Sequence, residues 1–119
     1  MDSLSATVRF GAGSTVRVVD MSGDIDGRAE AALDRAYAEA VALGGPTVHL
    51  NFTNVGYINS TGIALIVGLL ARARKDGREV AAFGLSDHYR EIFQITRLAD
   101  FVHMYADEAS AIASAPAST

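Results

Sequence analysis

The sequence predicts an α/β fold, in which a mixed, mostly parallel five-stranded sheet begins with a hairpin and is packed with about four helices. Short stretches of alternating apolar and polar residues predict strands, and longer stretches with apolar residues at helical spacing predict helices. Two predicted strands come first, and strands and helices alternate after them. Such alternation is typical of parallel strands joined by right-handed crossovers.

The hairpin is predicted from two neighbouring stretches of alternating residues. Residues 6–10 form the first strand, and residues 15–21, which contain three valines, form the second. Residues 11–14, with the sequence Gly-Ala-Gly-Ser, are typical of a turn between them. The pair is therefore expected to be antiparallel.

The first helix is predicted for residues 27–43, where apolar residues recur at helical spacing between charged ones. Asp26 is suited to cap its first turn, and the Gly-Gly-Pro run at residues 44–46 is a strong stop. Residues 47–52 alternate and predict the next strand. Residues 53–59 are expected to form a loop.

A second helix is expected from about residue 61 to residue 76, and Gly77 ends it. Its first half is apolar on nearly every side and its second half is charged, which indicates a buried start and an end that reaches solvent. The remaining predicted elements are a strand at 79–83, a helix from Ser86 or Asp87 to 95, a strand at 101–105 and a short helix at 107–113. Residues 1–113 are expected to form one domain, with a flexible tail at 114–119.

Composition excludes several classes of protein. The chain has 119 residues, a net charge of -4 and no basic run, which argues against nucleic acid or an anionic membrane surface as the partner. It has no cysteine, so disulfides, thiol catalysis and cysteine zinc sites are excluded. We find no signal peptide at the start, and the longest apolar run, residues 63–71, is too short to span a bilayer. A soluble cytoplasmic protein is expected.

The candidate catalytic groups are weak. His49, His88 and His103 lie in different predicted elements without ligand spacing, which favours two strand histidines and one histidine on a helix surface. No glycine pattern matches a phosphate-binding loop. Asp24 and Asp26 lie two residues apart near a helix start, where capping and solvation explain them. We therefore expect neither an enzyme nor a cofactor.

The stretch Tyr57-Ile58-Asn59-Ser60-Thr61-Gly62 is the exception. Ser60 and Thr61 come where a strand gives way to a helix, so that nearby backbone N–H groups lack partners inside the helix. A hydroxyl at that position is exposed, and a phosphate added to it would be tolerated. The simpler alternative, that Asn59 or Ser60 is only the helix cap, stays open at this point.

Three segments together resemble a STAS domain of the anti-sigma factor antagonist type. Residues 22–26, Ser-Gly-Asp-Ile-Asp, resemble the glycine–acid–apolar–aspartate segment that ends the second strand of that family. Residues 48–55 resemble its third strand and the following turn. Residues 57–63 resemble its aspartate–serine–serine/threonine–glycine–leucine signature, which is the most specific of the three. The resemblance implies a STAS-like (SpoIIAA-like) fold.

The resemblance also implies a switch. In this family the unphosphorylated domain binds a serine kinase that doubles as an anti-sigma factor, and binding releases a sigma factor. The kinase phosphorylates the first hydroxyl of the signature, which breaks the complex, and a serine phosphatase restores it. The acceptor here would be Ser60, with Thr61 as the alternate. The partner-binding residues would be Asp24, Asp26, Asn54, Tyr57, Asn59, Ser60, Thr61 and Gly62.

The sequence departs from the family pattern at several positions where the family has acidic residues and this chain has asparagine. Asn59 stands where the family has an aspartate, so the cap is kept but a carboxylate that could assist phosphoryl transfer is missing. Asn51 and Asn54 are also amides where acids are common. Two alternatives follow: a STAS scaffold that docks on a transporter, lipid-trafficking or stress-signalling complex without being phosphorylated, and a small enzyme, for which the sequence offers no polar cluster. A monomer and a weak homodimer are both open.

Overall fold

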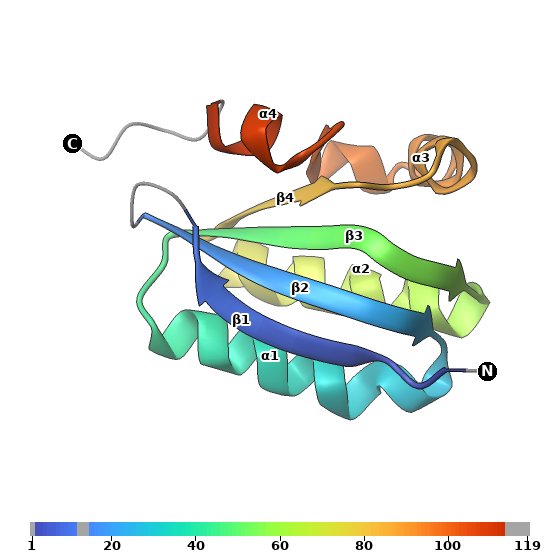
Figure 1. Cartoon of the computed structure of the whole chain (residues 1–119), viewed down its shortest axis with the longest axis horizontal. Helices are drawn as coiled ribbons and strands as arrows, with labels where there is room; N and C mark the ends of the chain where they lie inside the picture. The colour runs from blue at the N-terminus through green and yellow to red at the C-terminus, as the bar shows by residue number, and fades with distance from the viewer. Residues whose placement is uncertain (1, 12–14, 114–119) are drawn as a thin grey trace.

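A computed structural model describes residues 2–11 and 15–113, and its five strands form one sheet in the order β1-β2-β3-β4-β5. β1 and β2 are antiparallel, and every other neighbouring pair is parallel. The strands are β1 (Ser5–Phe10), β2 (Val16–Ile25), β3 (Thr47–Ile58), β4 (Glu79–Phe83) and β5 (His103–Tyr105). The predicted mixed sheet is confirmed (Figure 1).

The helices also follow the predicted order. They are α1 (Glu30–Ala42), α2 (Ser60–Lys75), α3 (Asp87–Ile95) and α4 (Glu108–Ala113), with 3-10 turns η1 (Gly27–Ala29) and η2 (Leu98–Asp100). Asp26 caps η1 rather than α1, because the first turn of the predicted helix is a 3-10 turn. Ser86 caps α3 through a hydrogen bond from the Tyr89 N–H. Most of the predicted turn at 11–14 and the whole predicted tail lie outside the described residues.

The predicted loop at residues 53–59 is wrong. β3 continues to Ile58, and β2 continues to Ile25, so the two strands remain paired where the sequence lost its alternation. Their register shifts twice, between Asp20 and Ser22 and between Gly23 and Ile25. Irregular pairing of this kind breaks the two-residue period, which is why the extension could not be recognised from the apolar pattern.

One face of the sheet carries the main core. Val48, Leu50 and Phe52 of β3 point to this face, where α1 and α2 cover the sheet (Figure 1). Phe93 of α3 meets Phe52 edge-on, with ring centroids 5.9 Å apart. This packing fixes α2 and α3 against the strands whose ends form the site described below.

The start of α2 is less buried than its sequence indicated. Gly62, Ile66, Leu69, Leu70 and Ala73 face the core, but Ala64, Val67, Gly68 and Ala71 form an exposed stripe. These four residues remain exposed, and three of them are too small to expose much apolar area. The expectation that the start of this helix is buried is therefore wrong for this stripe.

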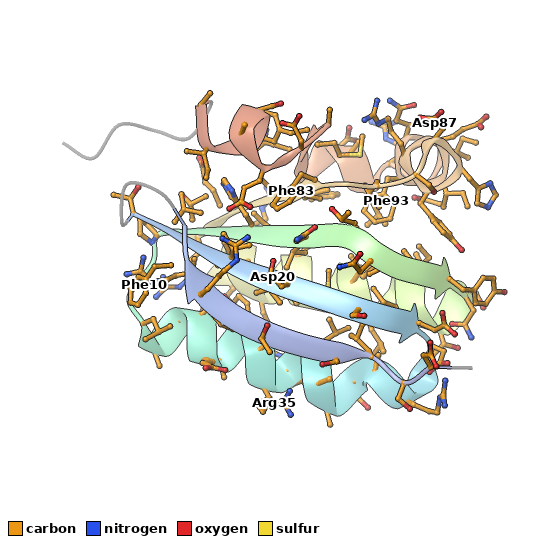
Figure 2. All side chains as sticks on the ribbon, in the orientation of Figure 1. Phe10, Asp20, Arg35, Phe83, Asp87 and Phe93 are labelled. Carbon is orange, nitrogen blue, oxygen red and sulfur yellow. The ribbon has the colours of Figure 1, made fainter. Side chains whose placement is uncertain are left out.

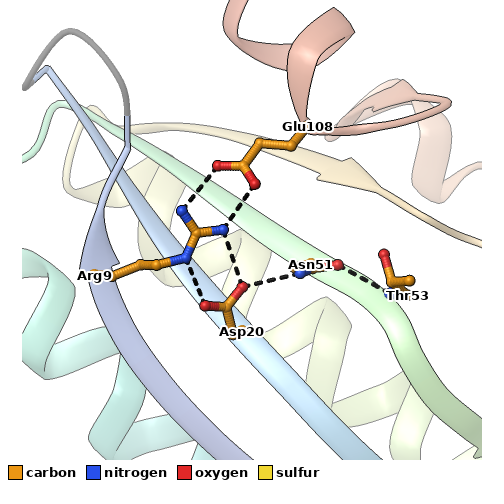
Figure 3. Close-up of polar contacts among 5 residues, drawn as sticks. All are labelled: Arg9, Asp20, Asn51, Thr53 and Glu108. Carbon is orange, nitrogen blue, oxygen red and sulfur yellow. Dashed lines mark hydrogen bonds and ion pairs between the residues drawn. The ribbon is translucent and has the colours of Figure 1, made fainter.

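The other face of the sheet is only partly covered. Ala111 of α4 packs on Val16, Val18 and Phe83. Figure 2 labels Phe83 on the side of the sheet where α4 lies. Beside this small cluster Arg9 of β1 holds two carboxylates at once (Figure 3). Its guanidinium contacts Asp20 at 2.6 Å and Glu108 at 2.8 Å, and Asn51 donates a further hydrogen bond of 2.9 Å to Asp20. Arg9 thus ties the last helix to the first two strands.

Removing the Asp20 charge tests this tie. Burial alone would raise the pKa of the Asp20 carboxyl, but the hydrogen bonds from Arg9 and Asn51 outweigh it and hold that pKa below its usual value of 3.8. A lowered pKa stabilises the fold at higher pH, and this contribution is lost as the pH falls through the folded-state pKa. Asp20→Asn should lower the free energy of unfolding by about 1 kcal/mol at pH 7, since the ion pair is partly exposed.

The measurement is denaturant unfolding of both proteins between pH 7 and pH 2. The difference should be constant at neutral pH and shrink below pH 3.8. Asp2→Asn serves as the control, because it removes the same charge from an exposed position away from Arg9. A difference that persists undiminished at pH 2 would contradict this account of Asp20.

Candidate functional site

The candidate site lies where β2 and β3 end and α2 begins. The paired ends of the two strands place Ser22 beside Asn54 and Ile25 beside Ile58. The Asn59 N–H donates to the Ile25 carbonyl oxygen at 3.2 Å, so the pairing continues to the first residue before the helix. The segments around Asp24 and Ser60, which are far apart in the sequence, are thereby brought together.

Asn59 caps α2. Its side-chain oxygen accepts a hydrogen bond of 2.8 Å from the Gly62 N–H, and its backbone is extended. Ser60 and Thr61 are the first two helical residues, and both are exposed. Their own N–H groups have no acceptor among the described residues, as expected for the first turn of a helix. The exposed hydroxyl expected at the helix start is confirmed.

Gly62 lies directly against β2. A Cβ atom built at this position would overlap the carbonyl oxygen of Ile25. Any other residue would therefore push the start of α2 away from the end of β2. Gly62 therefore permits a close approach between the backbones of α2 and β2.

Tyr89 of α3 holds the end of β3 from the other side. The Ile58 N–H donates to the Tyr89 hydroxyl oxygen at 2.9 Å, and Tyr89 is only 9% exposed. Sequence reasoning did not single out this residue. Its helical spacing with Phe93 marked an inward-facing position, but no local signal shows that a buried tyrosine hydroxyl accepts from a distant strand.

The two candidate carboxylates have different surroundings. Asp26 accepts from the Arg28 backbone N–H at 2.9 Å and forms an ion pair with the Arg28 guanidinium at 2.8 Å. These hydrogen bonds from Arg28 hold the pKa of the Asp26 carboxyl below its usual range. Asp24 has no ion pair within the described part of the chain, and it lies against Gly56. Arg28, which the sequence indicated only as a polar position on a helix, thus compensates one of the two charges.

The other predicted site residues divide into two groups. Asn54 and Tyr57 lie in the second half of β3, and both are exposed. Tyr57 keeps 52% of its surface in solvent. Asn51 is not part of the site, because it belongs to the Arg9 network on the other face of the sheet. The structure therefore gathers every predicted partner-binding residue at one end of the sheet, around the start of α2.

The histidines lie apart from this site and from one another. His49 is buried in β3, His103 is exposed in β5, and His88 is exposed on α3, as the sequence indicated. Burial lowers the pKa of the His49 imidazole, although Glu108 acts in the opposite direction. The described residues contain no group of three or more His, Asp or Glu side chains that could hold a metal ion. None of the described helices is long and apolar enough to cross a membrane.

Comparison with known proteins agrees with the geometry. Residues 8–104 match the family model described as "Mlab, STAS domain". A curated relative from Staphylococcus aureus, named anti-sigma-B factor antagonist, is 30% identical over 86 residues, which cover 72% of this chain and 80% of the relative. The resemblance found in the sequence is confirmed.

Solved structures share the fold. An anti-sigma factor antagonist from Mycobacterium paratuberculosis superposes with a TM-score of 0.78 at 21% identity, covering 94% of this chain and 93% of that one. SpoIIAA in its unphosphorylated form gives a TM-score of 0.68 at 20% identity, covering 92% and 96%. The phosphorylated form of Bacillus SpoIIAA gives 0.68 at 17% identity, covering 93% and 100%. The predicted SpoIIAA-like fold is confirmed.

A pair of glycine substitutions in α2 tests the close approach at the site. Gly62→Ala should lower the free energy of unfolding by roughly 2–3 kcal/mol, because the added methyl group overlaps the Ile25 carbonyl oxygen. Gly68→Ala is the matched control, since nothing lies within 4 Å of a Cβ at that position. It should stabilise the helix by about 1 kcal/mol.

Thermal and denaturant unfolding of the two variants and the parent chain give the comparison. Two substitutions of the same chemistry in one helix should change stability in opposite directions. Equal effects at both positions would show that helix propensity, and not the contact with β2, governs residue 62.

Proposed function

The chain belongs to the STAS domain family, and we propose that it acts as an anti-sigma factor antagonist, a binding module without catalysis of its own. The observation that carries this proposal is the exposed Ser60 hydroxyl at the start of α2, held in place by the Asn59 cap and by Gly62. The name of the Staphylococcus aureus relative supports it. Such a protein would work in the cytoplasm, beside the transcription machinery.

The proposed partner is a serine kinase that doubles as an anti-sigma factor. Binding of this chain would displace a sigma factor, phosphorylation of Ser60 (or of Thr61 as the alternate) would break the complex, and a serine phosphatase would restore it. The binding surface would comprise the residues gathered at the ends of β2 and β3 and the start of α2: Asp24, Asp26, Asn54, Tyr57, Asn59, Ser60, Thr61 and Gly62.

The electrostatics of the helix start support a switch that acts on the complex and not on the fold. A phosphate on Ser60 would add close to two negative charges beside the unpaired N–H groups at the positive end of the α2 dipole. Within the domain this is mildly favourable. At a desolvated interface with a nucleotide-bearing partner, the same charge would be strongly unfavourable.

The nearby carboxylates would repel a phosphate on Ser60 only weakly. Asp26 is compensated by Arg28, so it adds little net repulsion to a phosphate on the neighbouring helix start. Asp24 forms no ion pair within the described residues and interacts with the Arg28 charge only at longer range. We infer that Asp24 contributes to partner binding by its charge, and that Asp26 contributes mainly by shaping the η1 turn.

A second candidate function is favoured by Asn59. The residue keeps the cap but removes the carboxylate that the family has before the serine, so phosphoryl transfer to Ser60 would lack a neighbouring acid. The chain would then be a STAS scaffold that docks on a larger assembly, a transporter, a lipid-trafficking complex or a stress-signalling complex, without being phosphorylated. Phosphorylation assays distinguish the two.

A charge at residue 60 tests the switch without a kinase. Ser60→Asp and Ser60→Glu should weaken binding of the anti-sigma factor by about tenfold or more, which calorimetry or surface plasmon resonance would measure. The melting temperature should change by no more than about 4 °C. Ser5→Asp is the matched control, since it adds the same charge to an exposed serine on β1. Loss of the fold in the Ser60 variants would contradict a switch that acts on the complex and not on the fold.

Phosphoryl transfer is tested directly with the purified chain, each serine-kinase anti-sigma factor from the same genome, and labelled ATP. Label should appear on the parent chain and be lost in Ser60→Ala but retained in Thr61→Ala. Asn59→Asp should accelerate labelling, because a carboxylate caps the helix equally well and supplies the missing acid. Binding without label would favour the scaffold, and absence of both would remove the leading proposal.

A further inference from the structure

A second surface of the molecule, between α2 and η2, has features that the proposed function does not use. Two of the six large apolar side chains that are exposed within residues 2–11 and 15–113 line it: Val67 at 45% and Phe101 at 52%. Isolated exposed apolar residues are common on protein surfaces, but their concentration around one depression indicates a binding site.

The depression contains an apolar hollow of about 270 Å³. Its walls are Val67, Leu70 and Ala71 of α2, facing Leu98 and Phe101 around η2. Two polar side chains, Arg74 and Thr96, complete the lining. An apolar cavity with very few polar groups is the usual form of a small-molecule site.

A second hollow of about 240 Å³ adjoins the first and has a different character. The two share Leu70, Arg74 and Phe101, so these side chains stand at the boundary between them. The second hollow is bordered by Arg78, Glu79, Asp100 and His103 beside apolar residues, and it is the more polar of the two. Each hollow is smaller than the roughly 300–1,000 Å³ of typical drug-sized ligand sites, which favours a small ligand.

The charges at the boundary favour an anion. The Arg74 guanidinium lies 5.3 Å from the centre of the Phe101 ring and has no carboxylate partner in the described part of the chain. The Arg78 Nε is buried and lacks a hydrogen-bond partner among the described residues. Asp100 is already paired with Arg97 at 2.9 Å, which leaves Glu79 as the opposing charge. The Arg78 guanidinium already donates through Nη1 to the Gly45 carbonyl oxygen. Arg74 is therefore the cation that, within the described residues, faces the hollows without a carboxylate partner.

We propose that these adjoining hollows bind a small anionic amphiphile, a molecule with one short apolar tail and one carboxylate-like head. The tail would occupy the hollow walled by Val67, Leu98 and Phe101, and the head would lie against Arg74 in the polar hollow. A guanidinium fork matches a carboxylate in charge and geometry, and stacking on Phe101 holds it at the boundary. This site is independent of Ser60 and of any anti-sigma factor.

The experiment is a titration of the ¹⁵N-labelled full chain with sodium octanoate, followed by amide chemical shifts. Octanoate should cause saturable shifts confined to residues 67–80 and 96–103. 1-Octanol, with the same tail and no charge, should bind about tenfold more weakly, and octyltrimethylammonium more weakly still. Sedimentation with phosphatidylglycerol vesicles forms a further arm, to distinguish a free amphiphile from a lipid surface.

Two pairs of variants locate the contacts. Arg74→Gln should reduce octanoate affinity to that of octanol, whereas Arg35→Gln, which removes a guanidinium from α1, should leave it unchanged. Phe101→Ser should weaken both ligands, whereas Ile95→Ser, at an exposed position outside either lining, should not. The spectrum of each variant reports at once whether the fold is intact.

Three outcomes would overturn the proposal. The first is the absence of saturable shifts with octanoate. The second is equal binding of the three probes, which would show an apolar surface without anion recognition. The third is binding to vesicles that depends on Arg74 without any response to octanoate, which would assign the surface to a membrane.

Discussion

The site depends on the contact between the start of α2 and the end of β2. Gly62 lies against the Ile25 carbonyl oxygen, and the same oxygen accepts from the Asn59 N–H. A helix that begins this close to a strand cannot rotate or shift without losing its cap or colliding with the backbone. The exposed direction of Ser60 is therefore a property of backbone packing. Tyr89 reinforces it from α3 by accepting from the Ile58 N–H.

The elements that could be predicted from sequence are those whose apolar pattern follows their burial. α1 and α3 were predicted to within a few residues from their helical period, and β4 residue for residue from a short apolar run that is buried on both faces of the sheet. The second half of β3 could not be predicted, since its pairing with β2 is irregular and its side chains are largely solvent-exposed. The exposed stripe of α2 was missed for the opposite reason. An apolar pattern that includes small residues such as Ala64 and Gly68 predicts a buried face, but residues of this size are also common at exposed positions.

The candidate site shows the same division. Asn59, Ser60 and Gly62 could be identified from their order along the chain, because capping, exposure and close approach are local requirements of a helix start. Arg28 and Tyr89 act through partners that the sequence does not place beside them. The sequence also did not show that Asn51 joins the Arg9 network. Successive residues of a strand point to opposite faces, and Asn51 shares its face with Asp20 and Arg9.

Asn59 separates two roles that an aspartate would combine. The amide oxygen accepts from the Gly62 N–H at 2.8 Å, so the geometry of the helix start does not need a carboxylate. What the amide cannot supply is negative charge beside the Ser60 hydroxyl, and the nearest acid on the adjoining turn, Asp26, is already paired with Arg28. In this arrangement the Ser60 hydroxyl is exposed, but no unpaired carboxylate on the adjoining turn is available to polarise it. In the proposed function, binding through this surface would require only this fold, whereas the rate of phosphoryl transfer to Ser60 would depend on acids that the kinase brings to the complex.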